Sequence, residues 1–157
     1  MNINYQSDFK IIERRVDGKA LTDVPFTFSY YVKKDKCYTA SFDGSTFFGC
    51  KPIDGGGIAV AFDHTNLGIG ELSVRRTYHI TDSVFGDNRF DIVSVEQTGI
   101  CLGKGATDTA VVEQYFEVPF DIVDTNNKPN ASVRDGVLYL YGSSASVESI
   151  TNNILTL

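Results

Sequence analysis

The sequence holds few residues that could carry out acid–base or nucleophilic chemistry. Its only histidines are His64 and His79. Asp63 precedes His64, but neighbouring residues at a strand end point to opposite sides, so Asp63 would orient that imidazole poorly. No G-x-S-x-G motif marks a nucleophilic serine. We therefore expect a protein that is not an enzyme and has no catalytic residues.

Metal and cofactor motifs are equally weak. Residues 99–105 (GICLGKG) are similar to a phosphate-binding loop, but the spacer is one residue short and Gly105 stands where a magnesium-binding Ser or Thr is needed. Two histidines and three scattered cysteines do not make a zinc site. Acidic turns such as Asp54-Gly55 match no calcium loop, although whether one of them holds an ion stays open. We predict no cofactor and no metal.

The three cysteines, Cys37, Cys50 and Cys101, form no C-x-x-C motif. The first eight residues lack the basic and apolar regions of a signal peptide. We therefore expect reduced thiols that pack as small buried hydrophobic groups, the alternative being one disulfide and one free thiol.

Composition narrows the function classes. The chain has 157 residues, a net charge of −6, 42% hydrophobic residues and 19 Phe and Tyr together (11 and 8), which predicts a folded domain. An acidic surface gains nothing from phosphate neutralisation, so we expect no nucleic-acid binding. The chain contains no apolar run long enough to span a membrane.

Alternation of apolar and polar residues with period two dominates the chain. In residues 71–80, for example, Leu72, Val74, Tyr78 and Ile80 share one face, and Ser73, Arg75, Thr77 and His79 share the other. A Gly-rich loop is expected at 99–109, and turns at 43–44, 54–57, 85–88 and 124–129. About nine strands with turns every 8–12 residues predict an antiparallel β-sandwich or barrel. The expected strands are 26–33, 36–42, 47–50, 58–62, 71–80, 89–98, 110–118 and 137–141.

The C-terminus has a different pattern. After the Ser-rich stretch 142–146, apolar residues recur at three- and four-residue steps, at Val147, Ile150, Ile154 and Leu157. Such a short segment is not stable as a lone helix, so it should dock on its own domain or on a partner chain. We predict a sandwich domain at 1–141, with a division into two small subdomains near 80–90 left open. Residues 142–157 then form a linker and a short C-terminal docking segment that contacts other copies in a homo-oligomer, a dimer or trimer.

Exposed aromatic residues leave a second class of function open. Tyr31, Tyr115 and Tyr139 could form a sugar-stacking platform, as in carbohydrate-binding modules, if they lay together on one sheet face. The chain has no Trp, the usual stacking residue, and core filling is the favoured interpretation of its aromatic residues.

Several segments together resemble a known module. They are 25–31 (PFTFSYY), 38–44 (YTASFDG) leading to Cys50, 58–63 (IAVAFD), 67–72 (LGIGEL), 78–87 (YHITDSVFGD) and 98–105 (TGICLGKG). In this order and spacing, over roughly residues 20–115, they are similar to the β-rich module of virion proteins in tailed phages and prophages of gut Bacteroidetes, including the crAss-like phages. Residues 85–88 depart from the family, which usually has Pro and Gly flanking the Asp.

The resemblance implies a virion structural protein, made in the host cytoplasm and located on the capsid surface. A capsid-decorating or head-fibre protein is favoured, since no long fibrous region follows residue 115. A tail- or collar-associated adaptor is the first alternative and a carbohydrate-binding module the second. The implied partners are the major capsid protein or other virion proteins, with no nucleic acid and no membrane.

Overall fold

The structure is a computed structural model that describes residues 1–63, 65–86, 88–118, 131–134 and 137–140. These residues form strands and turns, one 3-10 turn (η1, Leu21–Asp23) and no α-helix. The prediction of an all-β fold is confirmed. The strands are β1 (Asn2–Asn4), β2 (Phe9–Arg15), β3 (Phe26–Tyr31), β4 (Cys37–Phe42), β5 (Phe47–Phe48), β6 (Lys51–Pro52), β7 (Ile58–Phe62), β8 (Gly70–Thr81), β9 (Arg89–Gly103), β10 (Val111–Phe116), β11 (Ala131–Arg134) and β12 (Val137–Leu140).

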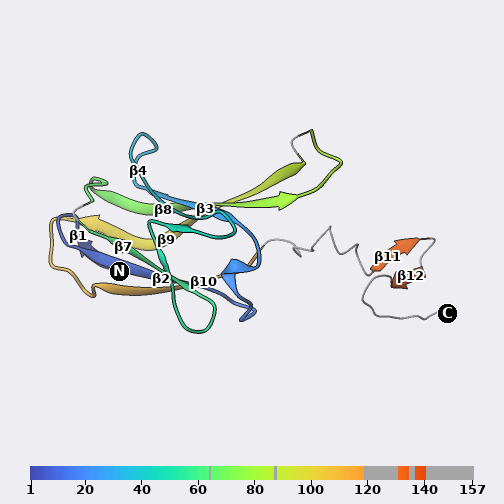
Figure 1. Cartoon of the computed structure of the whole chain (residues 1–157). Helices are drawn as coiled ribbons and strands as arrows, with labels where there is room; N and C mark the ends of the chain where they lie inside the picture. Colours follow the sequence, from blue (N-terminus) through green and yellow to red (C-terminus); the bar gives the residue numbers. More distant parts are fainter. Residues whose placement is uncertain (64, 87, 119–130, 135–136, 141–157) are drawn as a thin grey trace. The chain divides into compact units, whose positions relative to one another are not determined.

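The first of two compact units comprises the described parts of Met1–Ile80 and Asp91–Phe120. It contains a six-stranded sheet in the order β1-β9-β8-β3-β4-β5 and a four-stranded sheet in the order β10-β2-β7-β6 (Figure 1). Aromatic side chains join the two sheets. Phe28 meets Phe116 edge to face, with ring centroids 5.7 Å apart, and Tyr30 meets Phe62 in the same way at 5.1 Å. The two sheets therefore form a β-sandwich around one aromatic core.

Side-chain alternation explains why these strands pack in this way. In β3, Phe26, Phe28 and Tyr30 are fully buried between the sheets, whereas Thr27, Ser29 and Tyr31 face outward. Strand β8 repeats the pattern over twelve residues. Each strand thus presents one apolar face to the core and leaves its other face on the surface. In the six-stranded sheet, we call this surface the open face.

Two strand pairs are parallel, in a sandwich predicted to be antiparallel. β1 runs parallel to β9, and β2 runs parallel to β10. Both pairs join the first fifteen residues to strands far along the chain. The alternation of side chains is the same in parallel and antiparallel strands, so the sequence pattern carried no signal for the direction of these pairs.

Pairing with β1 also corrects one boundary. Residues 99–103 were expected to begin a Gly-rich loop, but they continue β9, with Ile3 of β1 paired to Leu102. Gly99 adopts a positive φ of 79°, which breaks the regular strand geometry. The loop interpretation was wrong there because the partner strand lies about a hundred residues away in sequence, beyond the reach of a local pattern.

The second unit comprises Thr81–Phe90 and the described part of Asp121–Leu157. In the turn between β8 and β9, the Asp82 N–H donates to the Asn88 carbonyl at 2.9 Å, and Asn88 adopts a positive φ of 57° that Asn tolerates well. β11 and β12 form an antiparallel pair with Ala131 opposite Leu140. The turn predicted at 124–129, the linker 142–157 and the interface residues Val147, Ile150, Ile154 and Leu157 lie outside the described residues.

Candidate functional site

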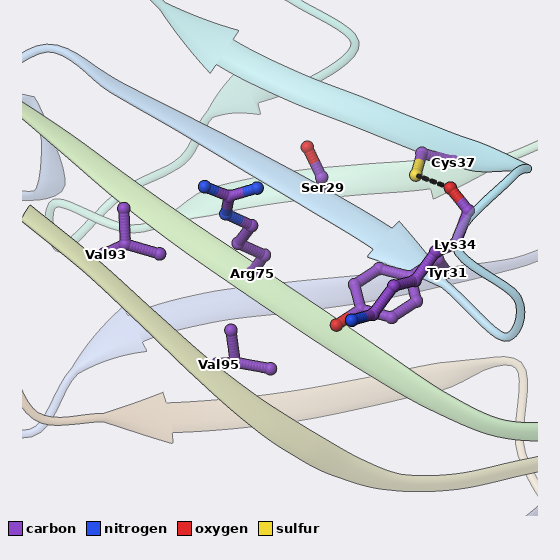
Figure 2. A pocket seen from close by; sticks show the side chains of 7 residues that line it. All are labelled: Ser29, Tyr31, Lys34, Cys37, Arg75, Val93 and Val95. Carbon is purple, nitrogen blue, oxygen red and sulfur yellow. Dashed lines mark hydrogen bonds between the residues drawn. The ribbon is translucent and has the colours of Figure 1, made fainter. Parts of the chain in front are cut away.

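The open face of the six-stranded sheet carries a groove with a volume of about 420 Å³. Figure 2 shows its side chains over neighbouring strands of this sheet. The lining residues come from β3, the β3–β4 turn, β4, β8 and β9; they are Ser29, Tyr31, Lys34, Cys37, Arg75, Val93 and Val95. A volume of this size falls in the range that holds small ligands, roughly 300–1,000 Å³.

The strand register explains why these side chains meet. Ser29 lies directly opposite Arg75 across the β3–β8 ladder. Tyr31, two residues further along β3, is paired with Cys37 of β4 and with Ser73 of β8. Directly opposed side chains on one sheet face lie within about 5.5 Å at their Cβ atoms, and diagonal ones within reach of long side chains. The groove is thus built around two successive outward positions of β3, those of Ser29 and Tyr31.

The groove is positively charged in an otherwise acidic chain. Arg75 and Lys34 are exposed, and no acidic side chain of the described residues forms a salt bridge or hydrogen bond with either. The whole chain carries a net charge of −6. Val93 and Val95 add an apolar strip, 42% and 58% exposed. The combination of two cations, one aromatic ring and an apolar strip is suited to a ligand that has both a negative group and an apolar surface.

A hydrogen-bonded row lies on the same open face. Asp91 Oδ1 is 2.7 Å from Nδ1 of His79, and His79 Nε2 is 2.9 Å from Oγ1 of Thr27. The order hydroxyl, imidazole, carboxylate is the order found in nucleophile–base–acid triads. His79 was predicted to face away from the core, and the structure places it there, half-buried.

Acyl transfer requires, besides the three groups of a triad, donors that stabilise an oxyanion, and the backbone of β3 around Thr27 does not supply them. An oxyanion must be stabilised by N–H groups aimed at the reacting centre. Thr27 lies inside β3, which is paired with β4 on one side and β8 on the other. The backbone N–H groups of a strand paired on both sides are used in the ladders. In the described part of the chain this row therefore bridges β3, β8 and β9 as a structural contact, and we assign it no reaction.

Beneath the groove, a buried ion pair joins the two sheets. Arg76 of β8 and Glu13 of β2 are 1% and 0% exposed, and Nη2 of Arg76 donates to Oε1 of Glu13 at 3.0 Å. The Tyr30 hydroxyl donates to the other carboxylate oxygen, Oε2, at 2.5 Å. Nη1 of Arg76 is 3.1 Å from Oε1 of Glu96. These contacts fix β2 against β3 and β8, and so fix the strands that carry the groove.

Burial and charge act on this network in opposite directions. Burial raises the pKa of Glu13, although the Arg76 guanidinium and the hydrogen bond from Tyr30 favour its ionised form. Burial together with the neighbouring Glu13 carboxylate raises the pKa of Tyr30 well above its usual value. The Arg76 guanidinium also stacks on aromatic rings, with its carbon 4.2 Å from the Phe116 ring centroid and 5.5 Å from that of Phe28.

The other candidate residues from the sequence do not form a site among the described residues. His64 lies outside them. The segment 99–105 is divided between β9 and the following turn. No three His, Cys, Asp or Glu side chains of the described residues gather as metal ligands would. None of the described elements is a helix long and apolar enough to cross a membrane.

The cysteines are free thiols, as predicted, but not buried ones. Cys37 and Cys101 are exposed and Cys50 is half-buried. Cys37 and Cys101 occupy outward positions on β4 and β9, and their small size does not by itself decide on which face of a strand they lie.

The aromatic platform proposed from the sequence is not formed by the residues the structure describes. Tyr31 lies in the groove on β3, and Tyr115 is 60% exposed on β10 of the other sheet. Nothing is described for the side chain of Tyr139. Tyr31 thus serves the groove as a single aromatic residue.

Sequence reasoning missed the groove and the ion pair. Arg75 was assigned to the outward face of its strand but given no role, and Arg76 was left off the inward face because a charged residue interrupts an apolar stripe. β2 was not predicted, because Glu13 occupies an inward position after Phe9 and Ile11. The available signal was the alternation of Phe9 and Ile11 with Lys10, which Ile12 and Glu13 then interrupt.

Comparisons of the chain with protein-family models, with curated proteins and with solved structures gave no match. Function therefore has to be argued from the residues themselves and from their geometry.

Proposed function

We propose that this chain is a virion structural protein of a tailed phage, a capsid-decorating or head-fibre protein bound to the capsid surface. Its partners are the major capsid protein or other virion proteins, and it acts by binding. The alternative placement within the same class is a tail- or collar-associated adaptor.

One observation carries the proposal. Most of the segments that resemble the phage module lie in the inner strands of the six-stranded sheet, and one of them, 58–63, includes β7 of the four-stranded sheet. Residues 25–31 include β3, 38–44 include most of β4, 67–72 and 78–81 include the two ends of β8, and 98–105 include the end of β9. Segments scattered over the sequence thus contribute strands to both sheets of one sandwich, which supports their origin in a single module.

Surface attachment fits the physical properties of the chain. A net charge of −6 disfavours contact with packaged DNA. Many copies on a symmetric shell allow weak individual contacts to add up through avidity. Self-association through Val147, Ile150, Ile154 and Leu157 would increase that effect.

Quantitative peptide mass spectrometry of purified particles of the encoding phage tests the proposal. The amount of this chain is scaled to the major capsid protein in the same sample. A ratio comparable to that of an abundant shell component supports decoration of the head. A ratio matching the rare tail and collar proteins replaces head attachment with the adaptor placement, and absence from the particle overturns the virion proposal.

The predicted self-contact has its own test. Deletion of residues 147–157 should lower the particle mass of the isolated protein in solution, measured by light scattering, because the apolar residues of the segment would be lost. A second variant keeps the full length and replaces the four apolar residues Val147, Ile150, Ile154 and Leu157 by Ser, and it should lower the mass in the same way. An unchanged mass in both variants removes the segment from the oligomer interface.

A further inference from the structure

We propose that the groove on the open face binds the terminal sugar of an oligosaccharide that carries a carboxylate, such as a uronic or sialic acid. This inference concerns the groove alone and goes beyond the attachment of the chain to a virion. It stands on the charge of the groove, on the ring of Tyr31, and on the position of the groove in the sheet.

The charge of the groove selects a negative group. Arg75 and Lys34 both line it, and among the described residues neither is paired with an acid. The planar fork of an arginine matches a carboxylate through two parallel hydrogen bonds. Arg75 lies at the middle of the groove, opposite Ser29. We therefore assign the carboxylate to Arg75 and a supporting charge to Lys34.

The remaining lining residues suit a sugar ring. The half-buried ring of Tyr31 offers an apolar surface with a polar tip, which suits the C–H face of a pyranose. Val93 and Val95 offer a second apolar strip on β9 (Figure 2). The Ser29 hydroxyl both donates and accepts hydrogen bonds, as ring hydroxyls require. The groove volume of about 420 Å³ is suited to one or two sugar units rather than a long polymer.

The position of the groove disfavours a peptide. An extended peptide binds a sheet by adding a strand to an open edge, where backbone groups are unpaired. The groove instead lies across β9, β8, β3 and β4, with Arg75, Ser29 and Tyr31 placing it over the central strands β8 and β3. At the groove β3 is paired on both sides, with β4 and with β8, so a ligand over these central strands meets side chains rather than free backbone groups. A small ring with its own hydroxyl and carboxylate groups fits that surface better than a strand does.

Binding is tested by isothermal titration of the full-length protein with three oligosaccharides. These end in glucuronate, galacturonate and N-acetylneuraminate, and each is paired with its methyl ester as a neutral counterpart. We expect at least one acid to bind. Its methyl ester should bind at least about tenfold more weakly, because the ester loses charge-assisted hydrogen bonds. Absence of binding by all three acids, or equal binding of acid and ester, overturns the proposal. Binding of a polyglutamate peptide in their place would overturn the assignment to a sugar.

Variants assign the binding to the groove. Arg75→Gln should weaken the binding of the acid by about tenfold to a hundredfold and leave the ester unaffected. Tyr31→Ala should weaken both, and Tyr31→Phe neither. Lys51→Gln, which removes one exposed positive charge from β6 of the other sheet, is the matched control. Equal weakening by Lys51→Gln and Arg75→Gln would reduce the effect to overall charge and contradict a specific site.

The thiols provide an independent readout in the wild-type protein. Cys37 lines the groove. Cys101 is also exposed, but it lies outside the groove. A bound sugar should slow the alkylation of Cys37 by iodoacetamide, followed by peptide mass spectrometry, and leave the rate at Cys101 unchanged. Protection of both thiols, or of neither at saturating sugar, would contradict binding in the groove.

Discussion

Arg75 and Arg76 are neighbours in β8, yet their surroundings differ in almost every respect. Arg76 points into the sandwich, is 1% exposed, and contacts Glu13, Glu96 and two aromatic rings. Arg75 points outward into the groove, and no acid among the described residues pairs with it. One step along a strand turns a side chain to the other face of the sheet. The same residue type therefore supports the core at one position and a surface for ligands at the next.

Tyr30 and Tyr31 repeat this contrast in β3. Tyr30 is fully buried and donates to Glu13, whereas Tyr31 lies half-buried in the groove. The two faces of one sheet thus have separate tasks, and matched substitutions at neighbouring positions can separate stability from binding.

The largest expected effect is at Arg76. Arg76→Met should lower the free energy of unfolding by about 3–5 kcal/mol, because it leaves the Glu13 carboxylate buried without its partner. Urea denaturation measures the change. Arg75→Met is the control and should change the free energy of unfolding by less than about 0.5 kcal/mol. Equal losses in the two variants would contradict the division between the faces.

A double variant tells charge from packing. Replacing both Glu13 and Arg76 by Met should recover most of the lost stability, because a buried ion pair and an apolar pair of similar volume are often close in free energy. If the double variant is as unstable as Arg76→Met alone, lost packing rather than the unpaired charge of Glu13 causes the loss of stability.

The second effect is at Tyr30. Tyr30→Phe removes the donor to Oε2 of Glu13 and should cost about 1.5–3 kcal/mol, the range for a hydrogen bond to a charged group. Tyr31→Phe, one residue away on the open face, is the matched control and should leave the urea midpoint unchanged. Stability lost by both variants would argue against the burial pattern of β3.

Glu13 also gives a pH dependence with a defined sign. Its pKa in the folded protein is raised above the ordinary value of 4.5, so the folded state holds this proton more tightly than the unfolded state does. The contribution of Glu13 to stability is therefore full below pH 4.5 and declines as the pH rises through the folded pKa. As the pH rises through this window, wild type should lose unfolding free energy relative to Glu13→Gln, which cannot ionise at this position. The matched control is Glu71→Gln, which removes one exposed carboxylate from β8.

The smallest effect is expected at His79. His79→Gln should cost less than about 1 kcal/mol, because the Asp91 partner is 37% exposed and water competes for the contact. Thermal unfolding at neutral pH measures it. A loss as large as that of Arg76→Met would show that the row from Thr27 to Asp91 holds the sheet together.

The predictability of the fold differs between its strands. The hairpin of β3 and β4 and the long strand β8 could be predicted, because apolar and polar residues alternate there and turn residues separate them. β2 was missed because Glu13 occupies a core position. The charge of Glu13 is compensated there by Arg76, which lies on a strand 63 residues further along the chain. Nonlocal pairing likewise turned 99–103 from an expected loop into part of β9.

The groove shows the same limit. The outward position of Arg75 followed from the period of two, but its place beside Tyr31 depends on the register of three strands. Sequence spacing does not set that register when the strands are distant. The pattern could therefore indicate which residues face outward and not which of them meet.

The most direct test of this division is the thermal unfolding midpoint with and without a saturating oligosaccharide that ends in a sugar acid, for wild type and Arg75→Gln. A ligand that binds only the folded state raises the midpoint. We predict equal midpoints for the two proteins alone and, on addition of the sugar, a clearly larger rise in wild type than in Arg75→Gln. An equal rise in both proteins, or a midpoint of Arg75→Gln that is already much lower without sugar, would contradict a binding role for the open face.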